Sequence, residues 1–399
     1  MHNPIPIDQA TELIAARVHP LPEESVAFDE ADGRFLARAI EAPIDLPRFD
    51  NSAMDGYAVR AADTPGRLRI VGESAAGAPF AGRVEAGQAV AISTGAALPD
   101  GADAVAPIED VEAQATQIAI PDAVSAGACV RYAGGDIRRG DRLLDAGTRI
   151  GPAQIGALAA VGLSAAPCRR RPSVAVLATG TELRPPGADL GPGEIFDSNA
   201  PMLRAALRDA GALIAPIPTV ADNVEAHLTA LTEALRHDVV ITSGGVSVGD
   251  HDLVREAAGR LDVEEVFWRV AIRPGKPLSF GVRGDTLVFG LPGNPVSTLV
   301  CFELFVKPAL LSLQGARDAA PEFDIGRLAT PIRRNRERDD FIRVRARRAD
   351  RTTILEPLSD QQSHQIAIAA QGDALARIPA GTGELEAGAE VSFLPIRRF

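Results

Sequence analysis

The stretch that decides the fold is DVVITSGGVSVGDHD, residues 238–252, in which an apolar run leads directly into a glycine-rich segment. The run Val239–Ile241 predicts a buried β-strand, and the glycines at positions 244, 245 and 249 predict a tight turn after it. In a doubly wound α/β domain, ligands collect where the carboxyl ends of strands meet the next helix. The stretch therefore predicts the fold class of this region and the edge of the sheet that binds a ligand.

The turn has two interpretations. In the first, its backbone N–H groups hold phosphate oxygens, while Asp250 and Asp252 supply hard oxygen ligands for a cation such as Mg²⁺. In the second, the glycines only turn the chain, and one of the two aspartates caps a helix over Leu253–Gly259. The stretch alone is compatible with both.

Strands and helices alternate on both sides of this stretch. Strands are expected at Val174–Ala178, Leu213–Ile217 and Val239–Ile241, and helices at Pro201–Ala210 and Val224–Leu235. The second helix has one apolar stripe at helical spacing, which is typical of a helix that covers a sheet. The alternation predicts βαβ units and a parallel sheet.

The α/β region is expected to close with strands at Leu278–Phe280 and Thr286–Phe289 and a helix over Val296–Leu313. Asn294 is the expected cap of that helix, with Pro295 in its first turn. The residues after this helix again read as all-β.

The first part of the chain has a different texture. A helix is expected over Asp8–Val18, a second beginning near Ser25, and a third over Ala153–Val161. The third can return to pack on the N-terminal helices, which predicts a discontinuous domain. Between Pro43 and about Arg142, short β-like runs separated by Gly and Pro predict a small all-β insert: Leu68–Val71, Gln88–Ile92 and Ala104–Ala106.

Length and composition set the class of protein. At 399 residues the chain exceeds the usual limit for one core, and its 46% hydrophobic and 24% charged residues are ordinary for a globular protein. The net charge of −12 disfavours nucleic acid and anionic membranes as partners. Arginines cluster between residues 327 and 348, but acidic residues interleave with them, so we interpret Arg343, Arg345 and Arg347 as a solvated strand face.

The cysteines and the N-terminal residues indicate the cellular compartment in which the protein is expected. The three cysteines are widely spaced and form no CxxC pair, which indicates neither a disulfide framework nor a structural zinc site and fits the reducing cytoplasm. The N-terminus has no apolar core of a signal peptide, and no apolar run is expected to reach membrane-spanning length.

Three loops at expected strand ends combine polar residues with glycine: residues 178–183, the loop after Ser243, and residues 291–295. Each adjoins the start of a helix, whose positive dipole end favours an anion. A fourth segment places Arg273 and Lys276 on either side of a Pro-Gly turn, where fixed positive charge suits an oxyanion; incidental surface charge is the alternative. Together these loops predict a cradle for a phosphate-bearing ligand.

The β insert has polar segments of its own, at residues 50–59, 93–95 and 134–141. The first places Asp50 and Asp55 close to a serine, an asparagine and a glycine. Each segment taken singly is also explained as a turn that needs glycine at positive φ.

Seven motifs taken together resemble the MoeA family of molybdenum insertases, which is related to the E domain of gephyrin. They occur here in the family's order: FDNSAMDGYAVR (49–60), STGAALPDGADAV (93–105), GGDIRRGD (134–141), TGTEL (179–183), SGGVSVGDHD (243–252), RPGKPLSFG (273–281) and LPGNPVS (291–297). The resemblance spans nearly the full chain. Two departures are Arg273, where the family often has lysine, and residues 361–364, which fit its pattern loosely and leave the roles of Arg343 and Ser363 open.

The resemblance implies a multidomain fold of mixed α/β and all-β class. Its four domains would be a discontinuous elongated domain (1–43 plus 142–170), a β insert (44–141), a doubly wound, MogA-like α/β domain that binds molybdopterin (171–316), and a C-terminal β-barrel (317–399). It also implies a cytoplasmic homodimer, in which the insert of one subunit approaches the α/β cleft of the other.

The implied reaction inserts molybdenum from molybdate into adenylylated molybdopterin, with Mg²⁺-dependent hydrolysis of the adenylate to AMP. The carboxylates that the resemblance assigns to catalysis are Asp55, Glu182, Asp222 and Asp252, the last three also as Mg²⁺ ligands. The substrate-binding residues that it assigns are Thr94, Asp136, Thr179, Gly180, Ser243, Gly244, Gly245, Ser247, Arg273, Lys276, Pro292, Asn294 and Pro295.

Two alternatives remain. The first is the preceding enzyme of the pathway, molybdopterin adenylyltransferase, which shares the SGG-type loop but would not need the insert or the barrel. The second is a gephyrin-like scaffold that binds a protein partner as its main task. In the insertase interpretation, the adenylyltransferase and apo-molybdoenzymes are expected as transient partners.

Overall fold

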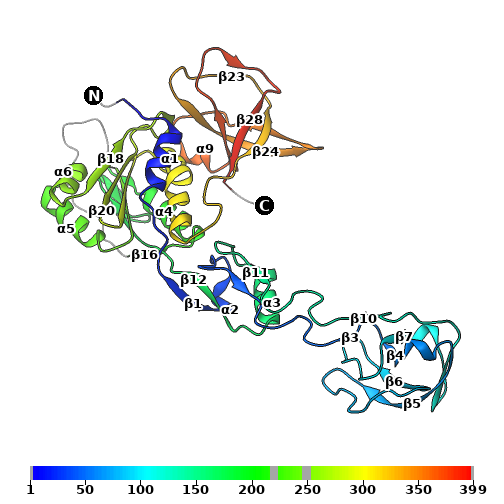
Figure 1. The fold of residues 1–399 in the computed structure, drawn as a ribbon. Helices are drawn as coiled ribbons and strands as arrows, with labels where there is room; N and C mark the ends of the chain where they lie inside the picture. Colours follow the sequence, from blue (N-terminus) through cyan, green and yellow to red (C-terminus); the bar gives the residue numbers. More distant parts are fainter. Residues whose placement is uncertain (1–2, 216–222, 245–252, 397–399) are drawn as a thin grey trace.

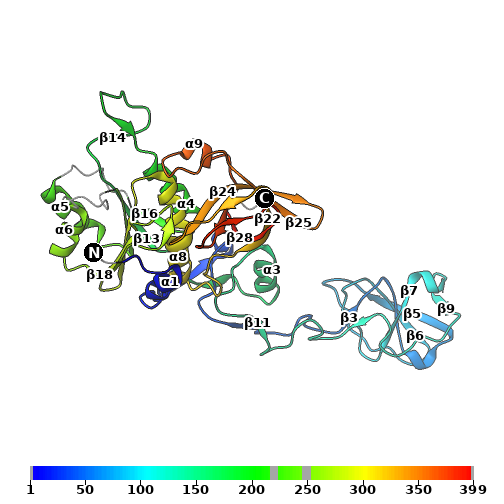
Figure 2. The ribbon, with the colours of Figure 1, turned by 90° about the horizontal axis from the view of Figure 1, so that it is seen from above.

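The computed structural model describes residues 3–215, 223–244 and 253–396. The molecule is elongated, with the β insert at one end and the α/β and C-terminal parts together at the other (Figures 1 and 2). A small part built from β1, α2, α3 and β12 lies between them. The predicted combination of α/β and all-β parts is confirmed.

The α/β part is built on a six-stranded sheet with the order β16-β13-β17-β21-β20-β18. The first four strands are parallel, and the last two are antiparallel to their neighbours. The bounds are Leu213–Ala215 (β16), Ser173–Ala178 (β13), Val239–Ser243 (β17), Thr286–Leu291 (β21), Ser279–Arg283 (β20) and Glu264–Trp268 (β18). All the strands predicted here are confirmed, although residues 216 and 217 of the expected strand Leu213–Ile217 lie outside the described residues.

Helices cover both faces of this sheet, as the doubly wound prediction requires. On one face lie α4 (Asn199–Asp209), α1 (Ile7–Ala15) and the long helical segment Pro295–Leu313, which share one apolar core. On the other face lie α5 (Val224–Ala234) and α6 (Leu253–Arg260), with a second core between them and the sheet.

The helix expected over Val296–Leu313 is the segment Pro295–Leu313. It comprises α7 (Pro295–Cys301), a π-helical turn (η3, Phe302–Val306) and α8 (Lys307–Leu313). An 18-residue window of this 19-residue segment has a mean hydropathy of 1.7, which suffices to cross a membrane by length and composition alone, although Glu303 and Lys307 interrupt its apolar residues. In the structure 72% of that window is buried inside the protein, against the sheet and α4.

The insert is a six-stranded sheet with the order β7-β4-β6-β5-β9-β8. The three strands predicted from sequence lie in β5 (Gly66–Ser74), β6 (Gln88–Ile92) and β7 (Ala104–Pro107). The remaining elements are β4 (Gly56–Val59), β8 (Glu112–Ala113), β9 (Gln117–Ile120), the short helices η1 (Ala61–Asp63) and η2 (Ile108–Asp110), and the pair β3 (Asn51–Ser52) with β10 (Val130–Arg131).

The part between insert and α/β sheet corrects the expected N-terminal helices. The segment near Ser25 is not a helix but β1 (Glu23–Ala27), which pairs with β12 (Ala165–Arg169) far along the chain. A four-residue helix, α2 (Phe28–Ala31), follows it, and α3 (Pro152–Ala160) packs into the same small core. The pair β2 (Ile40–Glu41) and β11 (Arg142–Leu144) leads to the insert.

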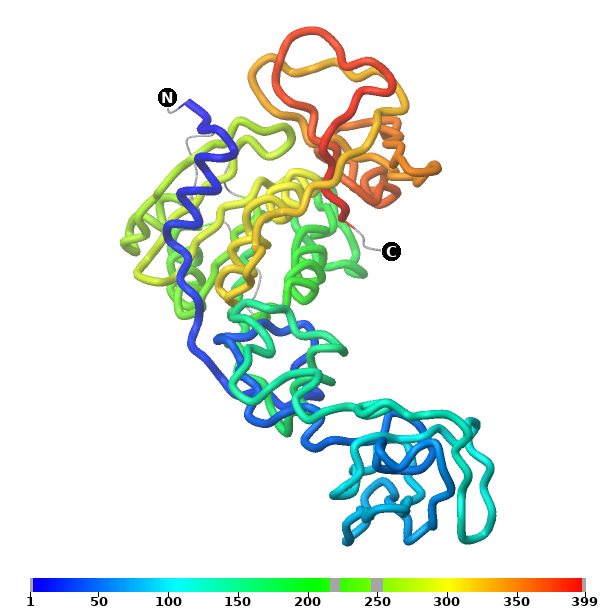
Figure 3. Tube along the Cα trace, turned by 45° about the vertical axis from the view of Figure 1, so that its right-hand side comes forward, coloured from blue at the N-terminus to red at the C-terminus, as the bar shows by residue number. Residues whose placement is uncertain are grey.

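Helix α1 does not join this small core. Its buried residues Ala10 and Ile14 belong to the core of the α/β part, and Figure 3 shows the helix beside that part before the chain runs on to β1. The apolar stripe of α1 therefore finds its partner in the helix that ends at Leu313.

The C-terminal part is a closed barrel of five strands. Its strands pair in the order β24-β25-β22-β28-β26 and close through β24 with β26. The bounds are Asp324–Leu328 (β22), Asp339–Ala349 (β24), Thr352–Pro357 (β25), Ala374–Ile378 (β26) and Glu390–Pro395 (β28), with the pair β23 (Ile332–Arg333) and β27 (Glu384–Leu385) and the short helix α9 (Ile366–Ala369) beside them. From the α/β part, β19 (Ile272–Arg273) adds to β24.

The interpretation of the arginine strand was wrong for one of its three residues. Arg345 and Arg347 are exposed, whereas the side chain of Arg343 is buried, with 1% exposure. Its guanidinium donates to the carbonyls of residues 360, 361 and 362, so a neighbouring loop replaces the solvent.

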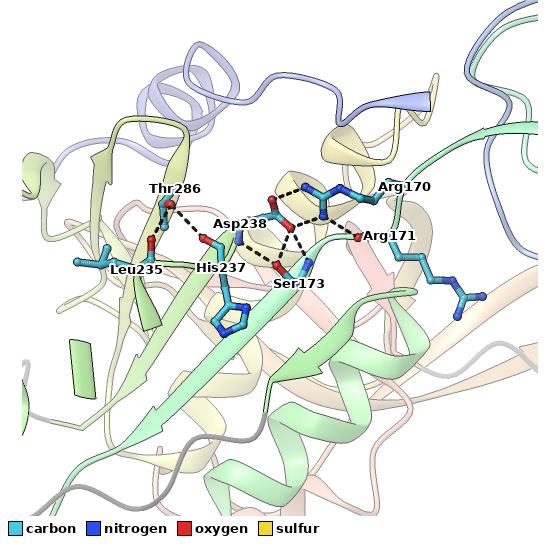
Figure 4. A network of polar contacts seen from close by, with 7 residues as sticks. All are labelled: Arg170, Arg171, Ser173, Leu235, His237, Asp238 and Thr286. Atoms are coloured by element: carbon cyan, nitrogen blue, oxygen red, sulfur yellow. Dashed lines mark hydrogen bonds and ion pairs between the residues drawn. The ribbon is translucent and has the colours of Figure 1, made fainter. Parts of the chain in front are cut away.

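A polar latch fixes the α/β sheet to the chain that enters it from β12 (Figure 4). Arg170 donates to both carboxylate oxygens of Asp238, at 2.7 Å each, and the backbone N–H and hydroxyl of Ser173 also donate to this carboxylate. Burial alone raises the pKa of Asp238, but the hydrogen bonds from Arg170 and Ser173 outweigh it and hold the pKa below its usual range. The latch lies at the start of β17, at the end of the sheet remote from the strand-end loops.

We predict that Asp238→Ala lowers the free energy of unfolding by about 2 kcal/mol at pH 7, because Arg170 and Ser173 lose the carboxylate that accepts their hydrogen bonds. The effect is limited to this size because Arg170 is partly exposed and solvent screens its ion pair. Since the folded pKa is depressed, the contribution is full above the unfolded pKa of about 3.9 and is lost as the pH falls through the folded pKa. The measurement is urea unfolding at several pH values, followed by fluorescence of the sole tryptophan, Trp268 in β18. A wild-type-to-variant difference that stays constant down to pH 3 would contradict the prediction.

Candidate functional site

The three strand-end loops predicted from sequence lie side by side, because β13, β17 and β21 are adjacent parallel strands. The backbone N–H of Thr179 donates to the carbonyl of Ser243 at 3.2 Å, and the N–H of Gly244 donates to the carbonyl of Leu291 at 3.3 Å. The hydrogen-bonded ladder of the sheet thus continues into the loops. Candidate residues Thr179, Gly180, Ser243, Gly244, Pro292, Asn294 and Pro295 all lie on these loops.

Gly244 is needed for the loops to come this close. Its φ is +92°, and a Cβ there would lie 2.8 Å from the carbonyl oxygen of Thr179. A Cβ on Gly293 would reach the Cα of Gly244 at 3.6 Å, so the third loop is in contact as well. Backbone packed against backbone in this way forms a rigid edge with its amide groups near one another.

Asn199 joins the same loops, and the sequence reasoning missed it. It is the first residue of α4, and its Nδ2 donates to the hydroxyl of Ser243 at 2.9 Å and to the carbonyl of Gly293 at 2.7 Å. The available signal was an asparagine at a helix start, which is ordinarily interpreted as a cap. Here α4 is entered instead through Asp197, which accepts from the N–H of Ala200.

Glu182 is the one predicted Mg²⁺ ligand within the described residues. Its carboxylate is exposed, folds back over Gly180, and has no ion pair within the described ranges. A Cβ on Gly180 would lie 2.7 Å from Glu182 Oε2, so this glycine leaves room for the carboxylate. A free, hard oxygen donor at the edge of an anion cradle fits Mg²⁺.

The other predicted metal ligands, Asp222 and Asp252, lie outside the described residues, as do Gly245, Ser247 and Asp250. Within the part of the chain that the structure describes, no three His, Cys, Asp or Glu side chains converge on a metal site. Glu182 itself leads into a projecting segment, in which β14 (Leu183–Arg184) pairs with β15 (Ile195–Phe196) (Figure 2).

A cavity of about 410 Å³ lies between the α/β part and the barrel. It brings together Arg273, Lys276, Pro292 and Asn294, which the sequence assigned to one site. Its other lining residues are Pro274, Gly275, Pro277, Ser297, Arg338, Asp360, Gln361, Gln362 and Ser363. Because the two parts share one apolar core, this cavity has fixed walls.

One of the cations that line this cavity is already paired with a carboxylate: Arg273 forms an ion pair with Asp340, which is 2% exposed. Burial raises the pKa of Asp340, although the charges of Arg273 and Arg338 oppose this. Burial lowers the pKa of the nearby Arg343, although Asp360 opposes this. Lys276 and Arg338 also line the cavity, and neither forms an ion pair with any described residue.

Asn294 plays a different part from the predicted one. It stands before α7, but its side chain makes no capping hydrogen bond; its Nδ2 donates to the hydroxyl of Ser363 at 2.9 Å. The carbonyl of Ser363 in turn accepts from the N–H of Val296 at 3.1 Å. Asn294 therefore ties the third strand-end loop to the barrel and closes one wall of the cavity.

The candidate residues of the insert lie apart from those of the sheet. Asp55 and Thr94 are neighbours, with the Thr94 N–H donating to Asp55 Oδ1 at 2.8 Å. Asp136 lies in the loop after β10, and all three side chains are exposed. Figure 1 shows the insert at the opposite end of the molecule from the α/β sheet. A single chain therefore does not bring these residues to the strand-end loops.

Comparison with known proteins covers the chain almost completely. Residues 5–162 match the family model "MoeA N-terminal region (domain I and II)", residues 175–312 match "Probable molybdopterin binding domain", and residues 326–396 match "MoeA C-terminal region (domain IV)". Molybdopterin molybdenumtransferase 2 of Mycobacterium tuberculosis is 35% identical, over 96% of this chain and 98% of its own length. Molybdopterin molybdenumtransferase of Staphylococcus aureus is 32% identical, over 98% and 96%.

Among solved structures, a molybdopterin biosynthesis MoeA protein of Pyrococcus horikoshii superposes with a TM-score of 0.87 at 34% identity and covers 100% of both chains. A second MoeA structure from the same organism gives a TM-score of 0.84 at 27% identity. The agreement extends over the insert, the α/β sheet and the barrel alike, and the chain belongs to the MoeA family.

Proposed function

We propose that this chain is a molybdopterin molybdenumtransferase, which inserts molybdenum from molybdate into adenylylated molybdopterin and releases AMP. The observation that carries the proposal is the position of the cation-lined cavity directly beside the glycine-rich strand ends. One ligand cradle and one oxyanion cavity share the loop of Pro292 and Asn294. This arrangement suits a reaction between a phosphate-bearing substrate and a second, small anion.

The strand-end loops are suited to the adenylylated pterin. The three loops lie at one sheet edge where α4 begins, so that its dipole favours negative charge. Close packing at Gly244 and Gly293 fixes the loops before the ligand arrives. Loops that are already fixed lose little entropy on binding and lower the cost of orienting the adenylate.

The cavity is suited to molybdate. Arg273 is paired with Asp340, whereas Lys276 and Arg338 form no ion pair with a described residue and would be available to the molybdate dianion. Lys276 comes from the α/β part, and Arg338 comes from the segment between β23 and β24. Lysine and arginine are the side chains that bind oxyanions.

Glu182, with Asp222 and Asp252, would hold Mg²⁺, which would neutralise the pyrophosphate link during hydrolysis. The role of Glu182 in this proposal is to supply a free carboxylate at the loop edge, and its exposure supports that role. Gly180 keeps the space around it open.

The carboxylate of Asp55 would reach the site only from a second subunit. We therefore propose a homodimer in which Asp55, Thr94 and Asp136 of one insert approach the strand-end loops of the other chain. The separation of the two groups within one chain supports this arrangement. We place the reaction in the cytoplasm, with the adenylyltransferase and apo-molybdoenzymes as transient partners.

The test is reconstitution of an apo-molybdoenzyme. Purified chain, adenylylated molybdopterin, Mg²⁺ and molybdate are expected to activate the apoenzyme well above a control without the chain. Omitting molybdate should abolish activation while AMP release is followed separately. Formation of adenylylated molybdopterin from molybdopterin and ATP, without molybdenum insertion, would instead indicate an adenylyltransferase.

A further inference from the structure

Asn199 lies where the three strand-end loops meet, and its environment is unusual for an asparagine. Its side chain is buried, with 9% exposure, and its Nδ2 group donates to Ser243 Oγ on the second loop and to the carbonyl of Gly293 on the third. Because the carbonyl of Ser243 accepts from the N–H of Thr179, the first loop joins the same network. One amide group therefore connects all three loops to the start of α4.

The other end of this amide indicates why an asparagine is present. Its Oδ1 is buried and accepts no hydrogen bond from any described residue. A buried acceptor without a donor is destabilising, whereas an apolar side chain of similar size would not carry that cost. The unpaired Oδ1 therefore offsets part of the stability that Asn199 contributes to the fold. The advantage of asparagine over an apolar side chain at this position lies in its two donated hydrogen bonds.

We propose that Asn199 is a positioning residue, which holds the loops after β13, β17 and β21 in the arrangement that binds the adenylylated pterin. This inference rests on the proposed function for its ligand. Asn199 acts through Ser243 and Gly293 and does not contact the substrate, because its own polar atoms are buried or engaged.

The chain provides a matched control at the far end of the same helix. Gln314 is buried, with 2% exposure, and its Nε2 donates to the carbonyls of Ala210, just after α4, and Leu310. It is likewise a buried amide with two donated hydrogen bonds, but it lies away from the strand-end loops. Asn199→Ala and Gln314→Ala therefore remove similar bonds at opposite ends of α4.

The first test compares steady-state kinetics of the full-length variants. Asn199→Ala is expected to reduce kcat/KM for adenylylated molybdopterin by about 100-fold, because a small displacement of positioning groups has effects of this size. The kcat/KM of Gln314→Ala is expected to stay within about threefold of the wild-type value, even where its Tm falls as far as that of Asn199→Ala. Asn199→Ala within threefold of wild type, or equal losses in the two variants, would overturn the proposal.

The second test uses Asn199→Asp, which has nearly the same shape. The introduced carboxylate faces the carbonyl of Gly293, which can only accept, so burial and this oxygen favour its protonated form. Protonation restores one O–H donor. The activity of this variant relative to wild type is expected to rise at least threefold from pH 8 to pH 6, while that of Asn199→Ala stays flat. Flat ratios in both variants would contradict a role for the donated hydrogen bonds.

The third test needs no substrate and separates this proposal from the proposed function. Amide hydrogen exchange in the free protein is expected to become at least tenfold faster at residues 179–180, 243–244 and 293–294 in Asn199→Ala, and to be unchanged in the insert. Unchanged exchange at these loops would reject the proposed positioning even if the wild-type enzyme inserts molybdenum. If exchange at these loops is faster in Asn199→Ala but the wild-type protein does not insert molybdenum, the proposed function is rejected and the positioning role of Asn199 stands.

Discussion

Asp55→Ala and Asp252→Ala are each expected to reduce molybdenum insertion on the order of 10³-fold, while thermal stability stays nearly unchanged. Asp55 is exposed, and the hydrogen bond from the Thr94 N–H is the one polar contact of its carboxylate to another described residue. Its removal therefore costs the fold little. The expected loss comes from the carboxylate's charge at the reaction site, measured by apoenzyme reconstitution at saturating Mg²⁺ and molybdate.

Asp55→Asn is the control for local structure. Asparagine keeps an oxygen that can accept from the Thr94 N–H but has no negative charge. We expect Asp55→Asn to be nearly as inactive as Asp55→Ala. Near-normal activity of the asparagine variant would show that the carboxylate's charge is not required at this position.

Mixing the two inactive variants tests whether the site lies between subunits. A heterodimer of Asp55→Ala and Asp252→Ala would contain one intact site, formed by the unchanged insert of one chain and the unchanged cleft of the other, and one site with both changes. Random exchange of subunits makes half of the dimers heterodimers, so about a quarter of wild-type activity should return. No recovery after confirmed subunit exchange would place both carboxylates in a site within one chain.

Lys276→Ala is expected to raise the KM for molybdate by about 10- to 100-fold, with little change in the KM for adenylylated molybdopterin. Lys276 lines the cavity and has no ion pair with a described residue, so its charge is available to an anion. Losing one charge-assisted hydrogen bond to molybdate accounts for the size of the effect. The measurement is initial rate against molybdate concentration at fixed, low ionic strength.

Two further variants make the charge argument specific. Arg338→Ala should raise the KM for molybdate to a similar extent, because Arg338 is the other cation of the cavity that forms no ion pair with a described residue. Arg345→Ala is the control: Arg345 is an exposed arginine of β24 whose side chain donates to Gln371. If Lys276→Ala leaves the KM for molybdate unchanged, molybdate binds elsewhere; an equal effect of Arg345→Ala would indicate general charge rather than this cavity.

The sequence predicted the α/β sheet well, because its strands and helices are local patterns. Val239–Ile241 is an uninterrupted apolar run, which predicts a buried strand, and the structure has β17 there. It failed where a distant segment determines the conformation. Residues 23–27 form a strand because β12 pairs with them, and Arg343 is buried because three carbonyls of another loop accept its hydrogen bonds.

The residues of the candidate site likewise divide into those that local sequence predicted and those that depend on distant segments. The site's glycines and Lys276 were predicted from sequence, because a tight turn needs glycine and an anion needs a cation whatever surrounds them. Arg338 was not predicted, because only the fold brings it to the cavity. Asn199 was missed, and Asn294 was assigned to the wrong bond, because an asparagine before a helix is ordinarily interpreted as a cap. Their actual partners, Ser243, Gly293 and Ser363, lie on other segments.

By itself, the sequence determined the doubly wound α/β part, the flanking β parts and the residue types of the site, since these follow from short-range periodicity and turn chemistry. Only the tertiary structure decided which cations form ion pairs, because Asp340 of the barrel pairs with Arg273 and three backbone carbonyls of residues 360–362 accept from Arg343. It alone separated Asp55 from the strand-end loops, because the chain between β2 and β11 carries the insert away from the sheet. Charge matching and separation both depend on contacts between distant segments, which no local pattern encodes.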